Sequence, residues 1–260
     1  MFEPRLALAS LSGQSDAAWA KAAQPYAGAA FLGGIAVDER SRAAARRMVA
    51  NRDREEFLPA DPFEFIGSQL AALDGTDLLA GYNVRSTVPE QVRAAAAVCA
   101  EHDAIIEVNA HCRQDELCAV GCGEALLKHA ERLCEQVAAA AESGAPVSVK
   151  VRTEVPGVDL TTLAARLVTA GATLLHIDAM DSEPVVRAVV EAVGDEAFVI
   201  ANNGVRNRAT VFEYLEFGVD AVSVGRPSDD PGVLARVNQA VDAWFAGAAE
   251  GRQSPGMEPP

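Results

Sequence analysis

The chain has 260 residues, half of them apolar, which is enough for one large domain with a buried core and excludes bulk disorder. Its formal net charge is −15, with three lysines against nineteen arginines, a balance that suits very high salt and points to a halophilic source. That charge argues against simple electrostatic capture of nucleic acid, an objection that weakens in strong salt. No segment has the pattern of a membrane span or a signal peptide, so we expect a cytoplasmic protein.

Short apolar runs alternate along the chain with segments of helical period. The runs that we expect to be strands are Arg5–Ser10, Gly28–Leu32, Leu78–Val84, Ala104–Asn109, Pro146–Arg152, Thr173–Asp178, Ala197–Asn202 and Ala221–Gly225. The expected helices between and after them include Pro89–Ala100, Ala125–Ala141, Leu160–Ala170, Glu183–Val193, Arg208–Phe217 and Gly232–Phe245. This alternation favours an α/β fold, a single-domain (β/α)8 TIM barrel, over a doubly wound sheet.

The barrel is expected to span residues 1–245. The unit after the second run is long, and Asp38–Asn51 and Asp61–Leu73 both have helical patterns, so 38–73 is predicted to be a helical insertion. The tail 246–260 is rich in Gly, Pro and Ala and is predicted to be disordered.

Polar residues gather at the carboxyl ends of the runs, where parallel α/β folds place their chemistry. In Val147-Ser-Val-Lys-Val-Arg152, period-two alternation puts the valines on one face and Lys150 on the other, inside the barrel. A buried lysine requires an anion. Two candidates stay open, Glu107 on the neighbouring run and a bound anionic cofactor.

Two small-residue turns follow the last two runs, Asn202-Asn-Gly204 and Gly225-Arg226. Barrels often bind phosphate at this place, on backbone N–H groups that glycine lets a ligand approach. The sequence therefore predicts a phosphate site here without saying what carries the phosphate.

The segment after the fourth run holds three cysteines, Cys112, Cys118 and Cys122. Their spacing matches no common metal or iron–sulfur pattern, and we predict no metal site. His111 either lowers the pKa of Cys112 to give a thiolate or is a solvated loop residue.

The ordered series of motifs resembles the tRNA-dihydrouridine synthases, FMN-dependent barrel enzymes, and especially a shorter archaeal branch. Asn109-Ala-His-Cys-Arg-Gln-Asp-Glu116 is similar to the family signature N-x-G-C-P-x-x-K. The other matching stretches are Leu8–Asp16, Val149–Arg152, Leu175–Asp178, Asn203–Gly204 and Val224–Arg226.

The resemblance implies reduction of the C5–C6 double bond of uridine in tRNA, with FMN as cofactor and NADPH or NADH as reductant. Cys112 would be the acid that protonates uracil C5. Lys150 and His176 would contact the flavin ring and ribityl chain, and Gly204, Gly225 and Arg226 would hold the phosphate. The full implied cofactor set is Ser10, Leu11, Asn83, Asn109, Lys150, His176, Asn203, Gly204, Gly225 and Arg226.

Several positions depart from the family pattern. His111 and Arg113 replace the Gly and Pro beside the cysteine, Glu116 replaces a Lys, and Asp178 stands where the family has Arg. Neither a basic patch nor the family's C-terminal helical tRNA-binding domain is evident in the sequence, so tRNA stays one expected partner among others.

Three alternative functions stay open. The first is an FMN oxidoreductase for a free pyrimidine or small enone, like the dihydroorotate and dihydropyrimidine dehydrogenases. The second is a non-catalytic module that binds phosphate or flavin. The third is a flavin-free barrel isomerase that uses Glu107 or Asp178.

Overall fold

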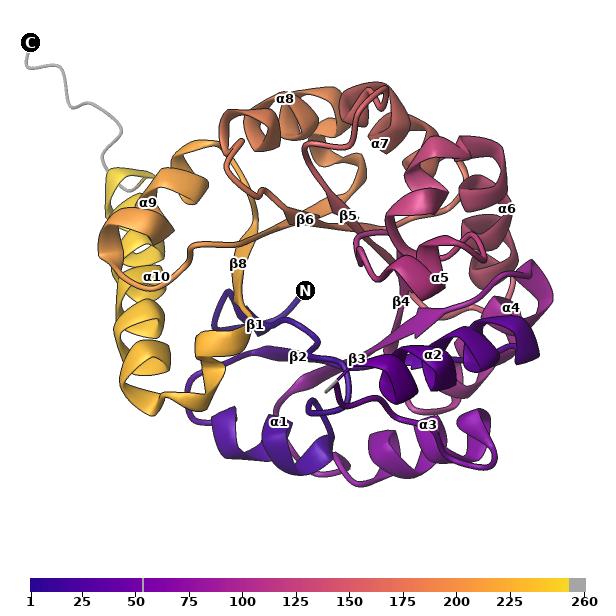
Figure 1. Ribbon diagram of the computed structural model, residues 1–260. Coiled ribbons are helices and arrows are strands. Elements are labelled where there is room, and N and C mark those ends of the chain that lie inside the picture. The colour runs from indigo at the N-terminus through magenta and orange to yellow at the C-terminus, as the bar shows by residue number, and fades with distance from the viewer. Residues whose placement is uncertain (53, 253–260) are drawn as a thin grey trace, which may run out of the picture.

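In residues 1–52 and 54–252, which the computed structural model describes, eight parallel strands form a closed barrel surrounded by helices (Figure 1). The strands pair in chain order, and β1 pairs with β8 to close the barrel. The predicted (β/α)8 fold is confirmed. The strands are β1 (Leu6–Leu8), β2 (Ala29–Ala36), β3 (Leu79–Arg85), β4 (Ile105–Asn109), β5 (Val147–Arg152), β6 (Leu174–Asp178), β7 (Phe198–Asn202) and β8 (Ala221–Val224).

The helices pack outside the strands and connect them. They are α1 (Ala17–Ala23), α2 (Glu39–Asn51), α3 (Pro62–Ala71), α4 (Pro89–Glu101), α5 (Asp115–Cys118), α6 (Ala130–Ala141), α7 (Leu160–Thr169), α8 (Pro184–Val193), α9 (Arg208–Glu216) and α10 (Pro231–Arg252), with 3-10 turns η1 (Gly123–Lys128), η2 (Gly194–Glu196) and η3 (Arg226–Asp229). None of the helices in the described part of the chain is long and apolar enough to cross a membrane.

Period-two alternation divides the strand side chains between two cores. The outward residues, such as Val147, Val149 and Val151 of β5, pack against the helices in the main hydrophobic cluster. The inward residues near the amino ends of the strands form a second cluster, which is Phe2, Ala7, Ala29, Phe31, Ile105, Leu174, Ile200 and Ala221. The barrel interior is therefore apolar at its amino end, which leaves the carboxyl end for polar side chains.

The expected insertion after the second strand contains α2 and α3. Asp38 caps α2 by accepting hydrogen bonds from the backbone N–H groups of Arg40 and Ser41, each at 3.0 Å. Asp61 caps α3, and Pro62 occupies its first turn, where a missing N–H costs nothing.

Three of the differences from the predicted elements have a local cause. β2 runs beyond Leu32, where the expected strand ended, to Ala36, because the glycines at 33–34 form a bulge with a register shift and pairing continues after it. The expected helix Ala125–Ala141 is divided at His129, whose N–H bonds the Leu126 carbonyl and closes η1. α10 continues through Arg252, which corrects the start of the predicted tail; its alanine-rich sequence favours helix, and 253–260 lie outside the described residues.

We predict that Phe31→Ala lowers the free energy of unfolding by about 3–5 kcal/mol, because it empties a well-packed site in the barrel interior. The ring of Phe31 is fully buried and lies 5.1 Å from that of His176. Denaturant unfolding measures the change, with Phe31→Leu as a milder control. Wild-type stability of Phe31→Ala would contradict a tightly packed interior.

Candidate active site

The carboxylate of Glu107 is the centre of a buried polar network inside the barrel. It is fully buried and accepts hydrogen bonds from Asn83 Nδ2 at 2.7 Å, Ser148 Oγ at 3.0 Å and His176 Nδ1 at 2.8 Å. Burial raises the pKa of Glu107, but His176, Lys150 and Asn83 together outweigh it and lower the pKa to about 2. Glu107 is therefore an anion at neutral pH.

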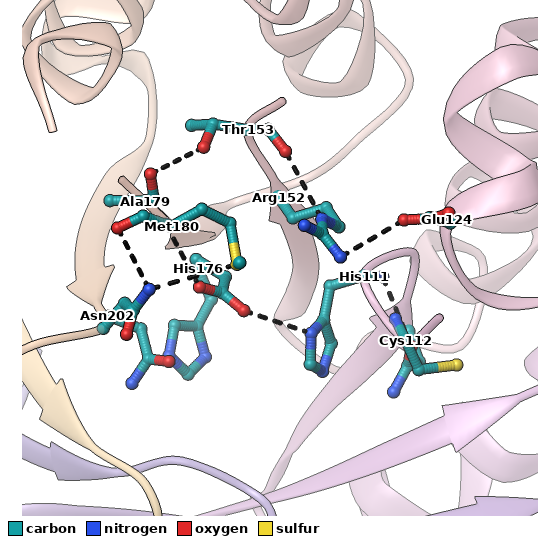
Figure 2. A network of polar contacts seen from close by, with 12 residues as sticks. His111, Cys112, Glu124, Arg152, Thr153, His176, Ala179, Met180 and Asn202 are labelled. Carbon is teal, nitrogen blue, oxygen red and sulfur yellow. Dashed lines mark hydrogen bonds and ion pairs between the residues drawn. The ribbon is translucent and has the colours of Figure 1, made fainter. Parts of the chain in front are cut away.

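The network continues from His176 toward β7 and β8. Its Nε2 lies 2.7 Å from Ser223 Oγ, which also accepts a hydrogen bond from Asn202 Nδ2 at 2.8 Å (Figure 2 shows His176 beside Asn202). Burial lowers the pKa of His176, so we assign a neutral ring that donates from Nδ1 to Glu107 and accepts at Nε2 from Ser223. Every polar atom of the ring is thereby satisfied.

Lys150 lies on the same inward face of β5 as Ser148 and is 2% exposed. Of its two predicted counter-anions, Glu107 pairs with His176 instead. Within the described residues, Lys150 Nζ has no hydrogen bond or ion pair. Burial lowers the pKa of Lys150, while Glu107 and Asp178 act to raise it. A nearly buried ammonium without a direct protein partner favours an anion bound beside it.

Asn109 links this network to the loop after β4. Its Nδ2 donates to Asn83 Oδ1 at 2.8 Å, and its Oδ1 accepts from the backbone N–H groups of His111 at 3.3 Å and Cys112 at 3.2 Å. Glu107 therefore orients Asn109 through Asn83, and Asn109 in turn fixes the backbone of this loop.

The Cys112 thiol is buried in a small apolar cluster apart from that network. Its partners there are Ala44, Met48, Leu117 and Cys122. In the view of Figure 2 its sulfur points away from His176. Burial raises the pKa of Cys112 to about 11, so the alternative in which His111 makes it a thiolate is wrong.

The ring of His111 faces Asp178, and it is not a solvated loop residue. Its Nδ1 lies 3.5 Å from Asp178 Oδ2, and its side chain is 23% exposed. Burial and then the positive charge of Lys150 lower the pKa of His111 to about 4, against the opposite effect of Asp178. At neutral pH the ring is uncharged.

Two buried arginines at the mouth were not predicted as site residues, although alternation already placed Arg152 on the same strand face as Lys150. Arg152 Nη1 lies 3.2 Å from Glu124 Oε2 (Figure 2). Arg85 Nη1 lies 2.7 Å from Glu56 Oε2, with both side chains 1% exposed, and its Nη2 bonds Ser12 Oγ. Alternation was the available signal, because Arg85 and Arg152 stand two residues after Asn83 and Lys150 on the same inward faces.

The predicted phosphate residues lie in the loops after β7 and β8, which are neighbours in the barrel. A Cβ on Gly204 would meet no atom within 4 Å, and one on Gly225 would meet only Leu11 Cδ2 at 4.0 Å, so both backbones are open to a ligand. Arg226 is exposed, and within the described residues it forms no ion pair. Asn203 adopts a left-handed φ of 90° and donates to the Met180 carbonyl at 3.1 Å.

The structure therefore brings most of the predicted site together at one end of the barrel. Asn83, Asn109, Lys150 and His176 form the inner group, and the rim group is Ser10, Leu11, Asn203, Gly204, Gly225 and Arg226. The backbone N–H of Leu11 already donates to Ser15 Oγ at 2.7 Å. Among the residues whose side chains the structure describes, 1–52 and 54–247, no three His, Cys, Asp or Glu side chains are arranged to hold a metal ion.

Removing the central carboxylate tests its organising role. Glu107→Ala leaves three buried donors unpaired and is expected to lower the free energy of unfolding by about 3 kcal/mol or more, at roughly 1–3 kcal/mol for each unsatisfied group. Glu107→Gln keeps the shape and one acceptor and should lose less. Equal denaturation midpoints for the two variants would contradict this role.

The pKa of His111 predicts an acid-sensitive fold. Because that pKa falls from the ordinary 6.5 to about 4 on folding, the unfolded chain binds more protons between these values. Stability contributed by His111 is thus present above about pH 6.5 and is lost as the pH falls toward 4. His111→Gln should flatten the melting temperature over this range, whereas parallel pH profiles for variant and wild type would refute the assignment.

Comparison with known proteins gives a family and a fold. The sequence model of the family described as dihydrouridine synthase matches residues 84–250. An uncharacterized protein of Methanocaldococcus jannaschii is 27% identical over 152 residues, which is 58% of this chain and 58% of that protein. The match thus spans less than two thirds of the relative's length.

Two solved structures share the fold at low sequence identity. A DHODH from Eimeria tenella in complex with ferulenol has a TM-score of 0.66 at 12% identity, over 94% of this chain and 82% of that one. A tryptophan synthase complex chain from Pyrococcus furiosus has a TM-score of 0.57 at 15% identity, over 95% and 100%. The family match covers more than half of the chain and includes Glu107, Lys150 and His176. This chain therefore belongs to the dihydrouridine synthase family.

Proposed function

We propose that this protein is an FMN-dependent oxidoreductase that reduces the C5–C6 double bond of uridine in tRNA, with NADPH or NADH as reductant. Membership of the family supports a flavin-type oxidoreductase on a barrel. The observation that carries the proposal is Lys150, a buried cation with no direct partner among the described residues, beside the amides of the inner group.

The residues present fit an anionic, phosphate-bearing cofactor. Lys150 supplies a desolvated positive charge, and the open backbones at Gly204 and Gly225 with the exposed Arg226 suit a phosphate. FMN, when bound, supplies hydride transfer. Of the inner group, Lys150 and Asn109 keep slight exposure and would contact its ring, while the fully buried Asn83 and His176 would act through their hydrogen bonds. Ser10 and Leu11 lie at the edge of the mouth.

Glu107 acts as a positioning residue in this proposal. Its carboxylate holds Asn83 and His176 at 2.7 and 2.8 Å, and Asn83 in turn holds Asn109. The inner amides and imidazole are thus fixed before any ligand binds, which reduces the reorganisation that binding and catalysis require.

Reduction of the double bond adds a hydride at C6 and a proton at C5, so the protein must provide an acid. We propose Cys112 for this role. Its pKa of about 11 keeps the thiol protonated at neutral pH, as a proton donor must be. The thiol lies against Met48, so its approach to the substrate depends on the position of the loop that Asn109 anchors.

The direct test supplies FMN, NADPH and an unmodified tRNA transcript in concentrated KCl, then digests the RNA and measures dihydrouridine by mass spectrometry. Parallel reactions contain free uracil or orotate. Dihydrouridine in the tRNA supports the proposal. Reduction of a free pyrimidine alone assigns a small-molecule substrate, and turnover of neither by the FMN-loaded protein overturns the assigned reaction.

Cys112→Ala is expected to keep its FMN and its rate of flavin reduction by NADPH. Reduction of the uracil ring should fall by about 100-fold or more, the usual contribution of a general acid. Cys134→Ala, on α6 outside the mouth, is the matched control. Stopped-flow absorbance separates the two half-reactions, and an undiminished second half-reaction in Cys112→Ala would remove this residue from the mechanism.

A further inference from the structure

α2 concentrates positive charge in an otherwise acidic protein. Residues 39–52 contain five arginines and one glutamate, in a chain whose net charge is −15. Arg40, Arg46 and Arg47 are exposed, while Ala44 and Met48 face inward and are buried. Within the described residues these three arginines form no ion pair. Their charges are thus available to an external partner.

Helix stability does not explain this arrangement. Arg46 stands four residues after Arg42, and after burial its charge is the main cause that lowers the pKa of Arg42. Like charges at this spacing destabilise a helix by about 0.2–0.5 kcal/mol. The last turn of α2 contains no basic residue, so the charges do not complement the helix dipole where that effect is strongest.

The helix lies at the carboxyl end of the barrel, where the candidate site opens. Ala44 and Met48 on its inner face pack against Cys112 in the loop after β4. Arg52, just beyond the helix, pairs with Asp115 of α5 at 2.6 Å. Figure 1 shows α2 beside β3 and α5, in front of the strands. α2, which carries the exposed arginines, therefore lies beside the loop that Asn109 anchors.

We propose that Arg40, Arg46 and Arg47, called here the α2 arginine face, bind phosphates of an RNA whose uridine enters the barrel mouth. This inference rests on the proposed function and assigns its RNA-binding surface. Charge complementarity carries the choice of partner, because a strongly acidic protein repels a polyanion except where arginines gather. Arg40 and Arg47 lie two helical turns apart, about 11 Å, which lets both reach phosphates of one short RNA segment.

The test compares Arg46→Ala/Arg47→Ala with the control Arg93→Ala/Arg166→Ala, which removes equal charge. Arg93 and Arg166 are exposed on α4 and α7 and pair with Glu142 and Glu131 at 3.3 and 3.2 Å. Binding of a fluorescent unmodified tRNA transcript is measured by anisotropy across a series of KCl concentrations. The first variant should bind at least about 10-fold more weakly, and its salt slope should be smaller by about 0.7–0.9 for each phosphate that an arginine no longer neutralises.

The control variant should bind as the wild type does, and Arg46→Lys/Arg47→Lys should restore most of the affinity. FMN content, reduction by NADPH and circular dichroism should be the same in all four proteins. These readouts separate loss of RNA binding from loss of the fold or of the flavin site.

Wild-type RNA affinity and salt slope in Arg46→Ala/Arg47→Ala would overturn the surface assignment, and continued reduction of tRNA would leave the proposed function standing. If the FMN-loaded wild type neither binds nor reduces the transcript, both the surface and the tRNA substrate are rejected. Arginine-dependent binding of poly-L-glutamate without binding of RNA would assign the face to an acidic protein and overturn the proposal.

Discussion

A single buried carboxylate, Glu107, organises the polar half of the barrel interior. An unpaired charge at this depth would be prohibitively unfavourable, and the fold tolerates it because Asn83, Ser148 and His176 donate to it from three other strands. Those side chains thereby acquire fixed orientations. Since Glu107 is satisfied by them, the nearby ammonium of Lys150 is left for another anion.

Positive charge is concentrated at the barrel mouth and on α2, although the net charge of the chain is negative. The surface is acidic, yet the mouth contains the buried cations Arg85, Lys150 and Arg152, and the exposed arginines of α2 stand beside it. Arg85 and Arg152 are paired with Glu56 and Glu124, which leaves Lys150 as the unpaired cation of these three. A net charge summed over the whole chain hides this separation, which is why the sequence showed no basic patch.

The strands and helices were largely predictable because the spacing of apolar residues differs between the two kinds of element. Val147, Val149 and Val151 define the outward face of β5 and so place Lys150 inside. The alternation of residues along a strand shows which face a side chain occupies, but not which residue it bonds. The sequence therefore left Glu107 as a candidate partner of Lys150, whereas in the structure Glu107 bonds His176. Such a choice depends on side-chain rotamers across three strands.

Loops have no periodic pattern of apolar residues, so the sequence did not predict the directions of their side chains. The direction of the Cys112 thiol follows from packing against Ala44 and Met48 of α2, an element far from it in sequence, and against Leu117 of the adjacent α5. The pair of Arg85 and Glu56 likewise joins a strand end to the insertion. The motif around Asn109 nevertheless led to the correct family, because it marks the loop that the inner network anchors.

The most direct test of this account is a titration of the purified protein and its Lys150→Met variant with FMN, followed by quenching of flavin fluorescence in concentrated KCl. Stoichiometric binding by the wild type and a loss of about 10-fold or more in affinity in Lys150→Met are predicted, because a charge-assisted contact contributes roughly 1.5–3 kcal/mol. Lys128→Met, an exposed control at the end of η1, should bind as the wild type does. Absence of FMN binding by the wild type, or equal affinity in Lys150→Met, would contradict the central claim that Lys150 awaits an anionic cofactor.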